Sequence, residues 1–546
     1  MLVYGDIVRR TTAGALLEEV EADLTRARAS HGDSRRDALV SALIGLGEAA
    51  QGVADLEHGQ TGQDRRTPAQ DALAAALLET ARGLLRNAAP QAEVLAPLAS
   101  LRSLKIEARQ PEGYAFYALY PEAYAAAANG VPGGGWRVIG VRSIGSSLAA
   151  VVAAALDAAP AVTVRPVGHP FARRIDLAPD LAAEFSRHDG PFAVVDEGPG
   201  LSGSSFGAVA DALQALGIAP DRIHFFPSHG GALGPQASEA HRARWTTASR
   251  HHLDFDRFTD GAKAVQAWAV SLTGPAVAPL QDLSGGGWRA LRGVAAPSNA
   301  GQERLKFLHR TARGDWLLKF AGLGRIGARK LELARTLHAA GFTPEPAGLI
   351  RGFLVERWIE PHPLPDEPPP LAGYLALRAA LPAEPGASLE ALIEMARVNA
   401  SEAGLDPAPL ERFDSKKLRP RVRPVLTDNR LHRWEWIAAP DGRWLKTDAL
   451  DHHAAHDLIG PQDIAWDVVG ATVEWNLDQE ETARLASAAG ADPELLALML
   501  PCYLAFQLGA YAMAADAHAG WPEEAERLQA RSGFYARNLR DLLARL

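Results

Sequence analysis

The stretch FAVVDEGPGLSGSS, residues 192–205, gives the clearest structural signal in the chain. Its four apolar residues predict a buried β-strand, and the helix-like run 208–216 follows its glycine- and serine-rich turn. A turn of this kind at the start of a helix exposes backbone N–H groups, which bind phosphate with help from the helix dipole. Asp196 and Glu197 directly follow the strand, where carboxylates could hold ribose hydroxyls or a Mg²⁺ ion on a diphosphate. The stretch therefore predicts a phosphate-binding loop in an α/β domain.

The chain around this stretch alternates between strand-like and helix-like segments. Further strands are expected from the apolar runs at 138–141, 161–167 and 223–226. The alternation is typical of a parallel sheet, which we expect over residues 106–245. A second small-residue loop, GVRSIGSS at 140–147, also follows a predicted strand and opens a helix.

The two loops, in this order, resemble those of type I phosphoribosyltransferases. The resemblance implies that Asp196 and Glu197 contact the ribose hydroxyls at a catalytic centre. It implies that the first loop holds the 5-phosphate through Ser202, Gly203, Ser204 and Ser205. It implies that the second loop holds the pyrophosphate through Arg142, Ser143, Gly145 and Ser146. It also implies phosphoribosyl pyrophosphate as the substrate, together with Mg²⁺. The alternative is a glycine-rich turn in some other doubly wound domain, since Gly198-Pro199-Gly200 lengthens the first loop.

Several aromatic residues precede the predicted sheet. They are Tyr114, Phe116, Tyr117, Tyr120 and Tyr124. They could stack on a base, or they could form a packed cluster between the sheet and the preceding helices.

The C-terminal half carries charged residues within apolar, strand-like segments. Lys319 lies in the apolar run 316–320, where an ammonium group is costly unless it meets an anion. Glu332, on the next helix-like run, could pair with it. Asp428 lies in a predicted loop, and Asp448 follows a predicted hairpin. Phosphoryl transfer needs such a pair of acids, because one orients the attacking hydroxyl while the other holds Mg²⁺ on the nucleotide.

The order of these motifs resembles the aminoglycoside phosphotransferase-like branch of the protein-kinase fold. The resemblance implies a bilobal domain that binds ATP and Mg²⁺. In it, Lys319 contacts the nucleotide, Asp428 is the catalytic aspartate and Asp448 is the metal-binding aspartate. The run DIAWD, residues 463–467, looks like a helix start of that family.

Each motif departs from the family pattern. No His-Gly pair precedes Asp428, and Arg433 stands where the family has an asparagine. His432 or Glu435 could take the metal-binding role of that asparagine. No clear GxGxxG loop precedes Lys319.

A cluster of histidines follows the second of these aspartates. The run DHHAAHD, residues 451–457, has two histidines at helical spacing that could chelate zinc. The alternative is that these polar residues line the cleft.

The composition excludes several classes of protein. The chain has 546 residues, of which 47% are hydrophobic and 22% charged, an ordinary balance for a multidomain globular protein. The net charge of −9 disfavours nucleic acid as a partner. The single cysteine, Cys502, rules out an intrachain disulfide framework and any zinc site made only of cysteines. The start has no apolar segment of a signal peptide, and we interpret the uncharged stretch 495–515 as buried helix. We therefore expect a cytoplasmic protein without a membrane partner.

These observations predict a multidomain protein of α/β and α+β parts. A helical N-terminal region, residues 1–105, is expected to cap the sheet domain or to mediate homo-oligomerisation. Residues 246–300 are expected to connect the sheet domain to the kinase-like domain, residues 301–546. The predicted function is bifunctional small-molecule chemistry, with phosphoribosyl transfer or cleavage at an N-glycosidic bond and ATP-dependent phosphorylation of a hydroxyl. The alternative is a non-catalytic sensor or scaffold that binds nucleotide and phosphoribosyl ligands; the acidic charge argues against an RNA-associated module.

Overall fold

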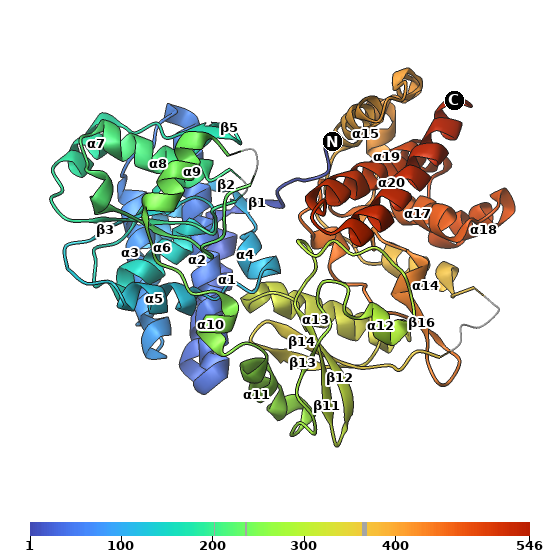
Figure 1. The fold of residues 1–546 in the computed structure, drawn as a ribbon, viewed down its shortest axis with the longest axis horizontal. Coiled ribbons are helices and arrows are strands. Elements are labelled where there is room, and N and C mark those ends of the chain that lie inside the picture. Colours follow the sequence, from blue (N-terminus) through green and yellow to red (C-terminus); the bar gives the residue numbers. More distant parts are fainter. Residues whose placement is uncertain (201, 235–236, 363–367) are drawn as a thin grey trace.

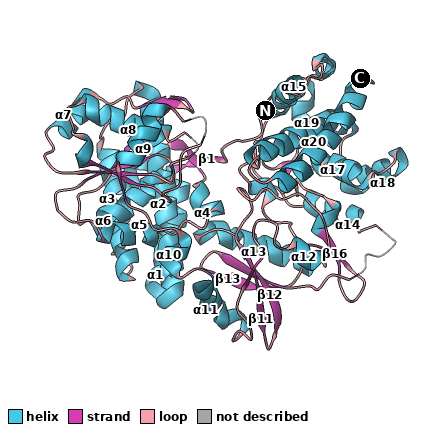
Figure 2. Ribbon diagram, in the orientation of Figure 1, coloured by secondary structure: helices cyan, strands magenta, loops and turns pink. Residues whose placement is uncertain are grey.

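The computed structural model describes residues 1–200, 202–234, 237–362 and 368–546. The chain forms two halves that lie side by side (Figure 1). One half contains the parallel sheet and the N-terminal helices, and the other contains an antiparallel sheet beneath a helical lobe. Figure 2 shows that helices enclose the strands of the first half, whereas the antiparallel strands form the lower end of the second.

The parallel sheet has the strand order β4-β3-β7-β8-β9. Its strands are β3 (Arg137–Val141), β4 (Val162–Val164), β7 (Phe192–Val195), β8 (Ile223–Phe226) and β9 (Ser249–Arg250). After β3 the chain adds β4 on one side, and β7, β8 and β9 then follow on the other. The carboxyl ends of β3 and β7 thus flank the topological switch point, where open α/β sheets bind ligands. The two small-residue loops lie at these ends, before helices α6 (Gly145–Ala155) and α8 (Ser204–Ala215).

The N-terminal helices pack on this sheet and on the second half. They are α1 (Ala13–Ala29), α2 (Gly32–Thr61) and α3 (Pro68–Arg86), and a two-stranded sheet of β1 (Val8–Thr12) and β2 (Lys105–Arg109) holds the ends of the region together. α2 is buried over most of its length, because it lies among α1, α3 and α6 and also touches α13 (Gly324–Ala339) of the second half. The region therefore caps the sheet, and homo-oligomerisation through it stays a prediction.

The antiparallel sheet has the order β10-β11-β12-β14-β13. Its strands are β10 (Gln281–Asp282), β11 (Lys306–Thr311), β12 (Gly314–Phe320), β13 (Pro346–Ile350) and β14 (Phe353–Arg357), and α13 (Gly324–Ala339) packs against it. β10 belongs to the segment expected to be a connector, so the sheet begins earlier than the boundary at residue 301. The rest of that segment forms α10 (Phe255–Thr259) and α11 (Ala262–Thr273). Phe255 stacks on Tyr120 of the first half and contacts Phe353 of the second, so this segment joins the two halves.

The helical lobe completes the second half. Its main helices are α14 (Leu371–Ala379), α15 (Leu389–Glu402), α17 (Ala465–Trp475), α18 (Gln479–Ala489), α19 (Pro493–Ala517) and α20 (Pro522–Leu543). A hairpin of β16 (Trp436–Ala438) and β17 (Trp444–Lys446) faces the antiparallel sheet. The first residues of the chain also pack here, since Val3 is buried in the core of this lobe and Asn399 bonds the backbone of Leu2.

Two helices in the described part of the chain are long and apolar enough to cross a membrane. They are α2 and α19, and 83% and 67% of their most apolar segments are buried inside the protein. This burial agrees with the interpretation of residues 495–515 as core helix. The cytoplasmic location stays a prediction.

Candidate functional site

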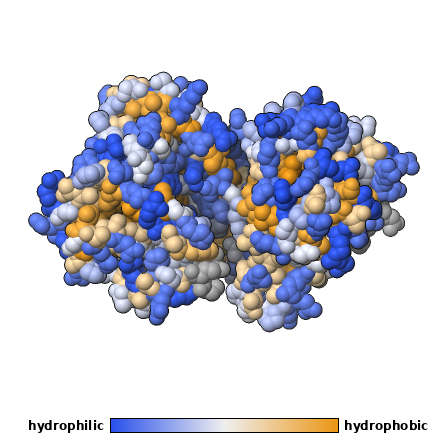
Figure 3. Space-filling model, turned by 90° about the horizontal axis from the view of Figure 1, so that it is seen from above, coloured by the Kyte–Doolittle hydropathy of each residue, from blue (hydrophilic) through white to orange (hydrophobic). Residues whose placement is uncertain are grey.

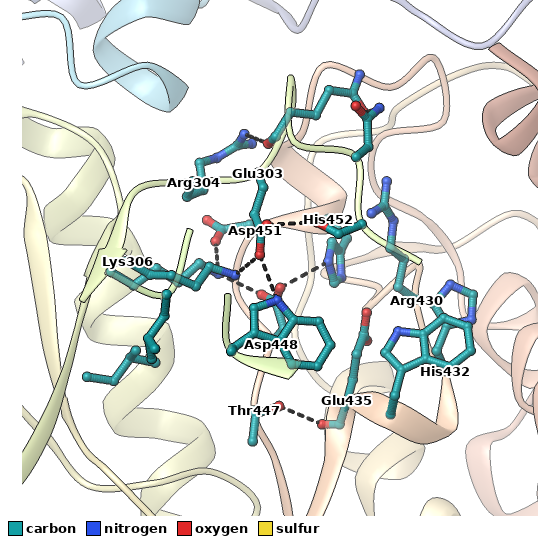
Figure 4. Close-up of a pocket in the computed structure, with 18 of the residues that line it drawn as sticks. Glu303, Arg304, Lys306, Arg430, His432, Glu435, Thr447, Asp448, Asp451 and His452 are labelled. Carbon is teal, nitrogen blue, oxygen red and sulfur yellow. Dashed lines mark hydrogen bonds and ion pairs between the residues drawn. The ribbon is translucent and has the colours of Figure 1, made fainter. Parts of the chain in front are cut away.

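A cavity of about 220 Å³ lies between the antiparallel sheet and the helical lobe. Lys319, on β12, and Asp448, just after β17, meet in its wall although they are 129 residues apart, with Nζ 2.7 Å from Oδ1. Asp451 is a second partner of the same ammonium group. Burial alone would lower the pKa of Lys319, but these two carboxylates hold it above its ordinary value. Figure 4 shows Asp448, Asp451 and His452 gathered around the cavity.

Glu332 does not take part in this arrangement. It is exposed, because the buried face of α13 carries Lys330 and the apolar residues three or four positions apart from it. Lys330 instead lies behind the cavity wall and pairs with Asp451, which lines it, with Nζ 2.5 Å from the carboxylate. The expected pairing of Glu332 with Lys319 is therefore wrong, and the acid on this helix is replaced by a base. The nearby Glu356 of β14 is buried, which raises its pKa to about 7.

Asp428 lies beneath the cavity rather than in its wall. Its side chain is fully buried, one carboxylate oxygen accepts hydrogen bonds from Tyr374 and Arg378, and the other lies 3.4 Å from Lys446 Nζ and 3.5 Å from His452 Nδ1. Burial would raise its pKa, but these positive neighbours lower it. Asp428 is not among the residues that line the cavity, contrary to the direct catalytic role expected for it.

The DIAWD run, residues 463–467, binds the backbone of the loop that carries Asp428. The backbone N–H groups of Asp428 and Asn429 donate to the Asp467 carboxylate at 2.6 and 2.9 Å. Burial, together with the neighbouring charge of Asp428, raises the pKa of Asp467 to about 7. Asp463 accepts from the backbone of Arg423 and Ala465.

The residues expected to bind a metal separate into two groups. Glu435 and Asp448 line the cavity, and Glu435, His452 and Asp428 offer ligand atoms within 4.8 Å of one another. This is the one such cluster among the described residues, so the histidine run 451–457 contributes only His452 to it. His432 also lines the cavity, but its Nδ1 lies 2.9 Å from Glu474 and its Nε2 lies 3.1 Å from the Tyr511 hydroxyl. With both ring nitrogens engaged, His432 is not available as a ligand. The carboxylates of Asp448 and Glu435 are the oxygen ligands that Mg²⁺ prefers.

Lys446 was not expected at this site. It is fully buried on β17, with Nζ 2.7 Å from Glu435, and it also bonds the carbonyl oxygen of Asp448. The sequence signal was present, since a lysine in the apolar run WLK before Asp448 needs an anion just as Lys319 does.

The loop between β10 and β11 contributes many residues to the cavity wall, and its residues 283–300 belong to the segment that was expected to be a connector. It begins with the run SGGG at 284–287, and its Arg292 donates to the carbonyl of Trp436 and the hydroxyl of Thr447 at 3.1 and 3.2 Å. Burial lowers the pKa of Arg292 to about 10. Glu303 holds the loop in shape by accepting from Gly286 N–H and Trp288 Nε1–H at 2.6 and 2.9 Å. The glycine run was therefore visible in the sequence. Its place beside the cavity was not, because the strand before it, β10, has only two residues and leaves too short a pattern to predict a sheet there.

The second predicted site lies at the switch point of the parallel sheet. Asp196 and Glu197 are half-buried at the carboxyl end of β7, and Glu197 Oε2 accepts from Gly113 N–H at 3.0 Å. Burial raises the pKa of Asp196 to about 7 and, with the charges of Glu112 and Asp196, that of Glu197 to about 8.

The first loop is closed by a hairpin of β5 (Val167–His169) and β6 (Ala172–Arg174). Ser202 and Ser204 are buried, and their hydroxyls donate to the carbonyl of Pro170 at the hairpin tip at 3.1 and 2.6 Å. Gly203 adopts a positive φ of 62° before α8, and Ser205 lies in its first turn. Two of the three hydroxyls expected to hold the 5-phosphate, those of Ser202 and Ser204, are therefore bonded to protein in this structure.

The pyrophosphate loop is also engaged within the protein. Arg142 is 4% exposed and forms ion pairs with Asp55 and Asp64 of the N-terminal region, so its expected role as a pyrophosphate ligand is not met. Ser146 is buried, and Ser143 lies at a small cavity near the N-terminal helices. A Cβ on Gly145 would lie 2.7 Å from the carbonyl oxygen of Val195, so helix packing alone requires this glycine.

Comparison with solved structures finds similarity over about half of the chain. A choline kinase from Streptococcus pneumoniae is 17% identical, and the alignment covers 50% of this chain and 98% of that one with a TM-score of 0.32. A spectinomycin phosphotransferase, solved with ADP and spectinomycin, is 11% identical over 52% of this chain and 99% of that one, with a TM-score of 0.34. A choline/ethanolamine kinase family protein from Mesorhizobium loti is 17% identical over 52% and 98%, with a TM-score of 0.33. No family model matches the chain, and no curated protein matches it.

Proposed function

We propose that the C-terminal half transfers the γ-phosphoryl group of ATP to a hydroxyl group of a small molecule. The observation that carries this proposal is the meeting of Lys319 and Asp448 in one cavity between two lobes. A lysine on a sheet and an aspartate after a hairpin are the groups that fix nucleotide phosphates and their metal in phosphoryl transfer.

The cavity offers both apolar and charged side chains to such a nucleotide. Leu283, Leu317 and Ile437 line the cavity and suit a base, whereas Lys319 and Arg292 suit its phosphates. Asp448 and Glu435 would hold Mg²⁺, which supplies positive charge at the phosphates. In the reaction, the acceptor oxygen bonds to the γ-phosphorus while the bond from that phosphorus to the β-phosphate oxygen breaks. ADP and a phosphate ester are released, and the hydroxyl proton passes to the solvent.

Asp428 would act on this reaction through its neighbours. Its carboxylate holds Lys446 and His452, and Lys446 in turn bonds Glu435. We therefore assign Asp428 and Lys446 a positioning role for Glu435 and His452.

We propose further that the parallel-sheet domain binds a ribose-phosphate compound, such as phosphoribosyl pyrophosphate, and makes or breaks an N-glycosidic bond. Asp196 and Glu197 at the switch point support this, because half-buried carboxyls with raised pKa values can bond ribose hydroxyls. Binding of a phosphate by the first loop requires the β5–β6 hairpin to move away from Ser202 and Ser204.

One experiment tests both sites. The full chain is titrated by calorimetry with a Mg²⁺–ATP analogue and, separately, with phosphoribosyl pyrophosphate. The affinities of Lys319→Met and Glu197→Gln are then compared with those of the wild type. We expect Lys319→Met to weaken only the first ligand, by about 10²-fold, and Glu197→Gln to weaken only the second, because each removes one charge from one site. Lys263→Met, at an exposed lysine of α11, is the control.

Three outcomes are informative. Failure of the wild-type chain to bind the ATP analogue would falsify the phosphotransferase proposal, and failure to bind phosphoribosyl pyrophosphate would remove the ribosyl proposal alone. Binding of both ligands without turnover of labelled ATP would instead identify a sensor.

A further inference from the structure

One carboxylate bridges two buried lysines at the wall of the cavity. Asp451 contacts Lys319 of β12 with its Oδ2 atom, and its Oδ1 atom lies 2.5 Å from the Nζ of Lys330 on α13. All three side chains are buried, with exposed fractions of 4–6%. Because each lysine uses a different oxygen, the charges follow one another in the order Lys319, Asp451, Lys330. Asp451 thus supplies to Lys319 a contact with an acid that Glu332 was expected to make.

Lys330 is enclosed by the first half of the molecule as well as by Asp451. Its Nζ lies 5.9 Å from the centre of the Phe116 ring, at the end of the helix α4 (Glu112–Phe116). Figure 1 shows α4 between the two halves, and Figure 3 shows the surface hollowed between them. Lys330 is not among the described residues that line the cavity. Its charge therefore acts on the cavity through Asp451, its one ion-pair partner in the described part of the chain.

Arg304 is a third cation near the same ring, but it does not share the carboxylate. Its guanidinium carbon lies 4.4 Å from the centre of the Phe116 ring, and its side chain lines the cavity and donates to the carbonyl of Gln302 at 2.6 Å. It forms no ion pair with Asp451 or with any other carboxylate of the described residues. Arg304 is therefore free to meet a phosphate, whereas the two lysines are held by Asp451.

Asp448, the other partner of Lys319, has two tasks that conflict. Its Oδ1 lies 2.7 Å from Lys319 Nζ, and its Oδ2 lies 3.6 Å from His452 Nε2. The proposed function gives Asp448 a Mg²⁺ ion, whose double charge competes with the ammonium group for the same carboxylate. When Asp448 turns to the metal ion, Asp451 is the carboxylate of the described residues that stays in contact with Lys319.

We propose that Asp451 and Lys330 are positioning residues, which hold Lys319 in the cavity wall while Asp448 binds the metal ion. Lys330 fixes one oxygen of the Asp451 carboxylate, and the other oxygen fixes Lys319. The inference rests on the proposed function, because it takes Lys319 as a ligand of nucleotide phosphates and Asp448 as a ligand of Mg²⁺. It adds the acid on which Lys319 depends and the base that keeps this acid in place.

A double-mutant cycle on the full chain tests the pair. The affinity for a non-hydrolysable ATP analogue is measured by calorimetry over a range of Mg²⁺ concentrations for wild type, Asp451→Asn, Lys330→Met and the double variant. We expect Asp451→Asn to weaken the analogue about tenfold and to raise the Mg²⁺ concentration needed for half-maximal binding, because Lys319 then competes with Mg²⁺ for Asp448. The double variant should bind no more weakly than Asp451→Asn, since Lys330 acts only through Asp451.

A second acid of the same cavity is the matched control. Asp457 lines the cavity, but it pairs with Arg430 at 3.4 Å and forms no ion pair with Lys319. Asp457→Asn removes the same charge and should leave the Mg²⁺ requirement unchanged. Thermal unfolding shows whether each variant is folded. Should Asp451→Asn fail to fold, Lys330→Met carries the test, because an Asp451 carboxylate that is no longer held in place has to raise the Mg²⁺ requirement as well.

The results separate this inference from the proposed function. A raised Mg²⁺ requirement in Asp451→Asn that the double variant does not exceed, in a chain that binds the analogue but does not turn over labelled ATP, supports the pair and removes the phosphotransferase. Turnover of ATP by the wild type, with unchanged or tighter analogue binding in Asp451→Asn, overturns the pair and leaves the phosphotransferase in place. Tighter binding would show that Asp451 occupies the place of a phosphate. Additive losses in the double variant also overturn the pair.

Discussion

At the scale of single residues, the carboxyl of Glu197 makes stability depend on pH. Burial and the charges of Glu112 and Asp196 raise its folded-state pKa from 4.5 to about 8. The folded chain therefore binds more protons than the unfolded chain between these values, so the contribution of Glu197 to stability is full below about pH 4.5 and is lost as pH rises through 8. The glutamine in Glu197→Gln is uncharged at every pH, so the stability of this variant does not fall through ionisation at this position.

Thermal unfolding of the two proteins measures the effect. We expect the melting temperature of Glu197→Gln, relative to wild type, to rise steadily between about pH 5 and pH 8.5. A difference that stays constant over this range would show that Glu197 is ionised in the folded protein. Glu79→Gln changes a half-exposed acid of α3 that bonds Arg82 and is the control.

At the scale of elements, the loop of residues 283–305 connects the antiparallel sheet to the helical lobe through hydrogen bonds. Glu524 of α20 accepts from Arg289 and from Ser298 N–H, each at 2.6 Å, and His518 accepts from Ala300 N–H. Glu524→Ala removes two of these hydrogen bonds and should make the loop more mobile, because charge-assisted hydrogen bonds contribute about 1.5–3 kcal/mol each. We therefore expect nucleotide dissociation to be about tenfold faster. Stopped-flow release of a fluorescent ATP analogue measures the rate. The neighbouring Glu523 has a side chain that is 90% exposed, so Glu523→Ala should leave the rate unchanged.

The elements that could be predicted from the sequence are those with a strong local pattern. The strand of residues 192–195 and its glycine turn were predicted because an apolar run followed by small residues has few alternatives. Lys319 and Asp448 were expected to share a cleft because the order of the motifs resembles that of the kinase fold, whereas the rule that a buried charge needs a partner pointed to Glu332, which is the wrong residue. Local pattern could not show that Asp55 and Asp64 would neutralise Arg142, because those acids are far from it in sequence. It also could not show that Tyr374 and Arg378 would take Asp428 out of the cavity.

At the scale of the whole molecule, the first residues tie the two halves together. Asn399 is fully buried, accepts from Leu2 N–H at 2.6 Å and donates to the carbonyls of Leu2 and Ala505 at 3.2 and 3.1 Å. Asn399→Ala should lower the free energy of unfolding by about 1–3 kcal/mol, since it leaves buried backbone groups without partners. Asn538→Ala removes a partly buried bond within α20 and should cost less. Denaturant unfolding of both variants measures the difference, and equal midpoints would contradict the proposed tie.

The tie between Leu2 and α19 also has a consequence for synthesis on the ribosome. Leu2 and Val3 can reach their final place only after Ala505, which is about 500 residues later in the chain, has been made. At about 5–20 residues per second, that delay is roughly 25–100 s. Throughout this time Val3 is without its native neighbours and free to bind a chaperone. Docking of this segment therefore has to wait for α19, so a bulky group fused directly before Leu2 should lower the yield of folded protein more than the same group fused directly after α20.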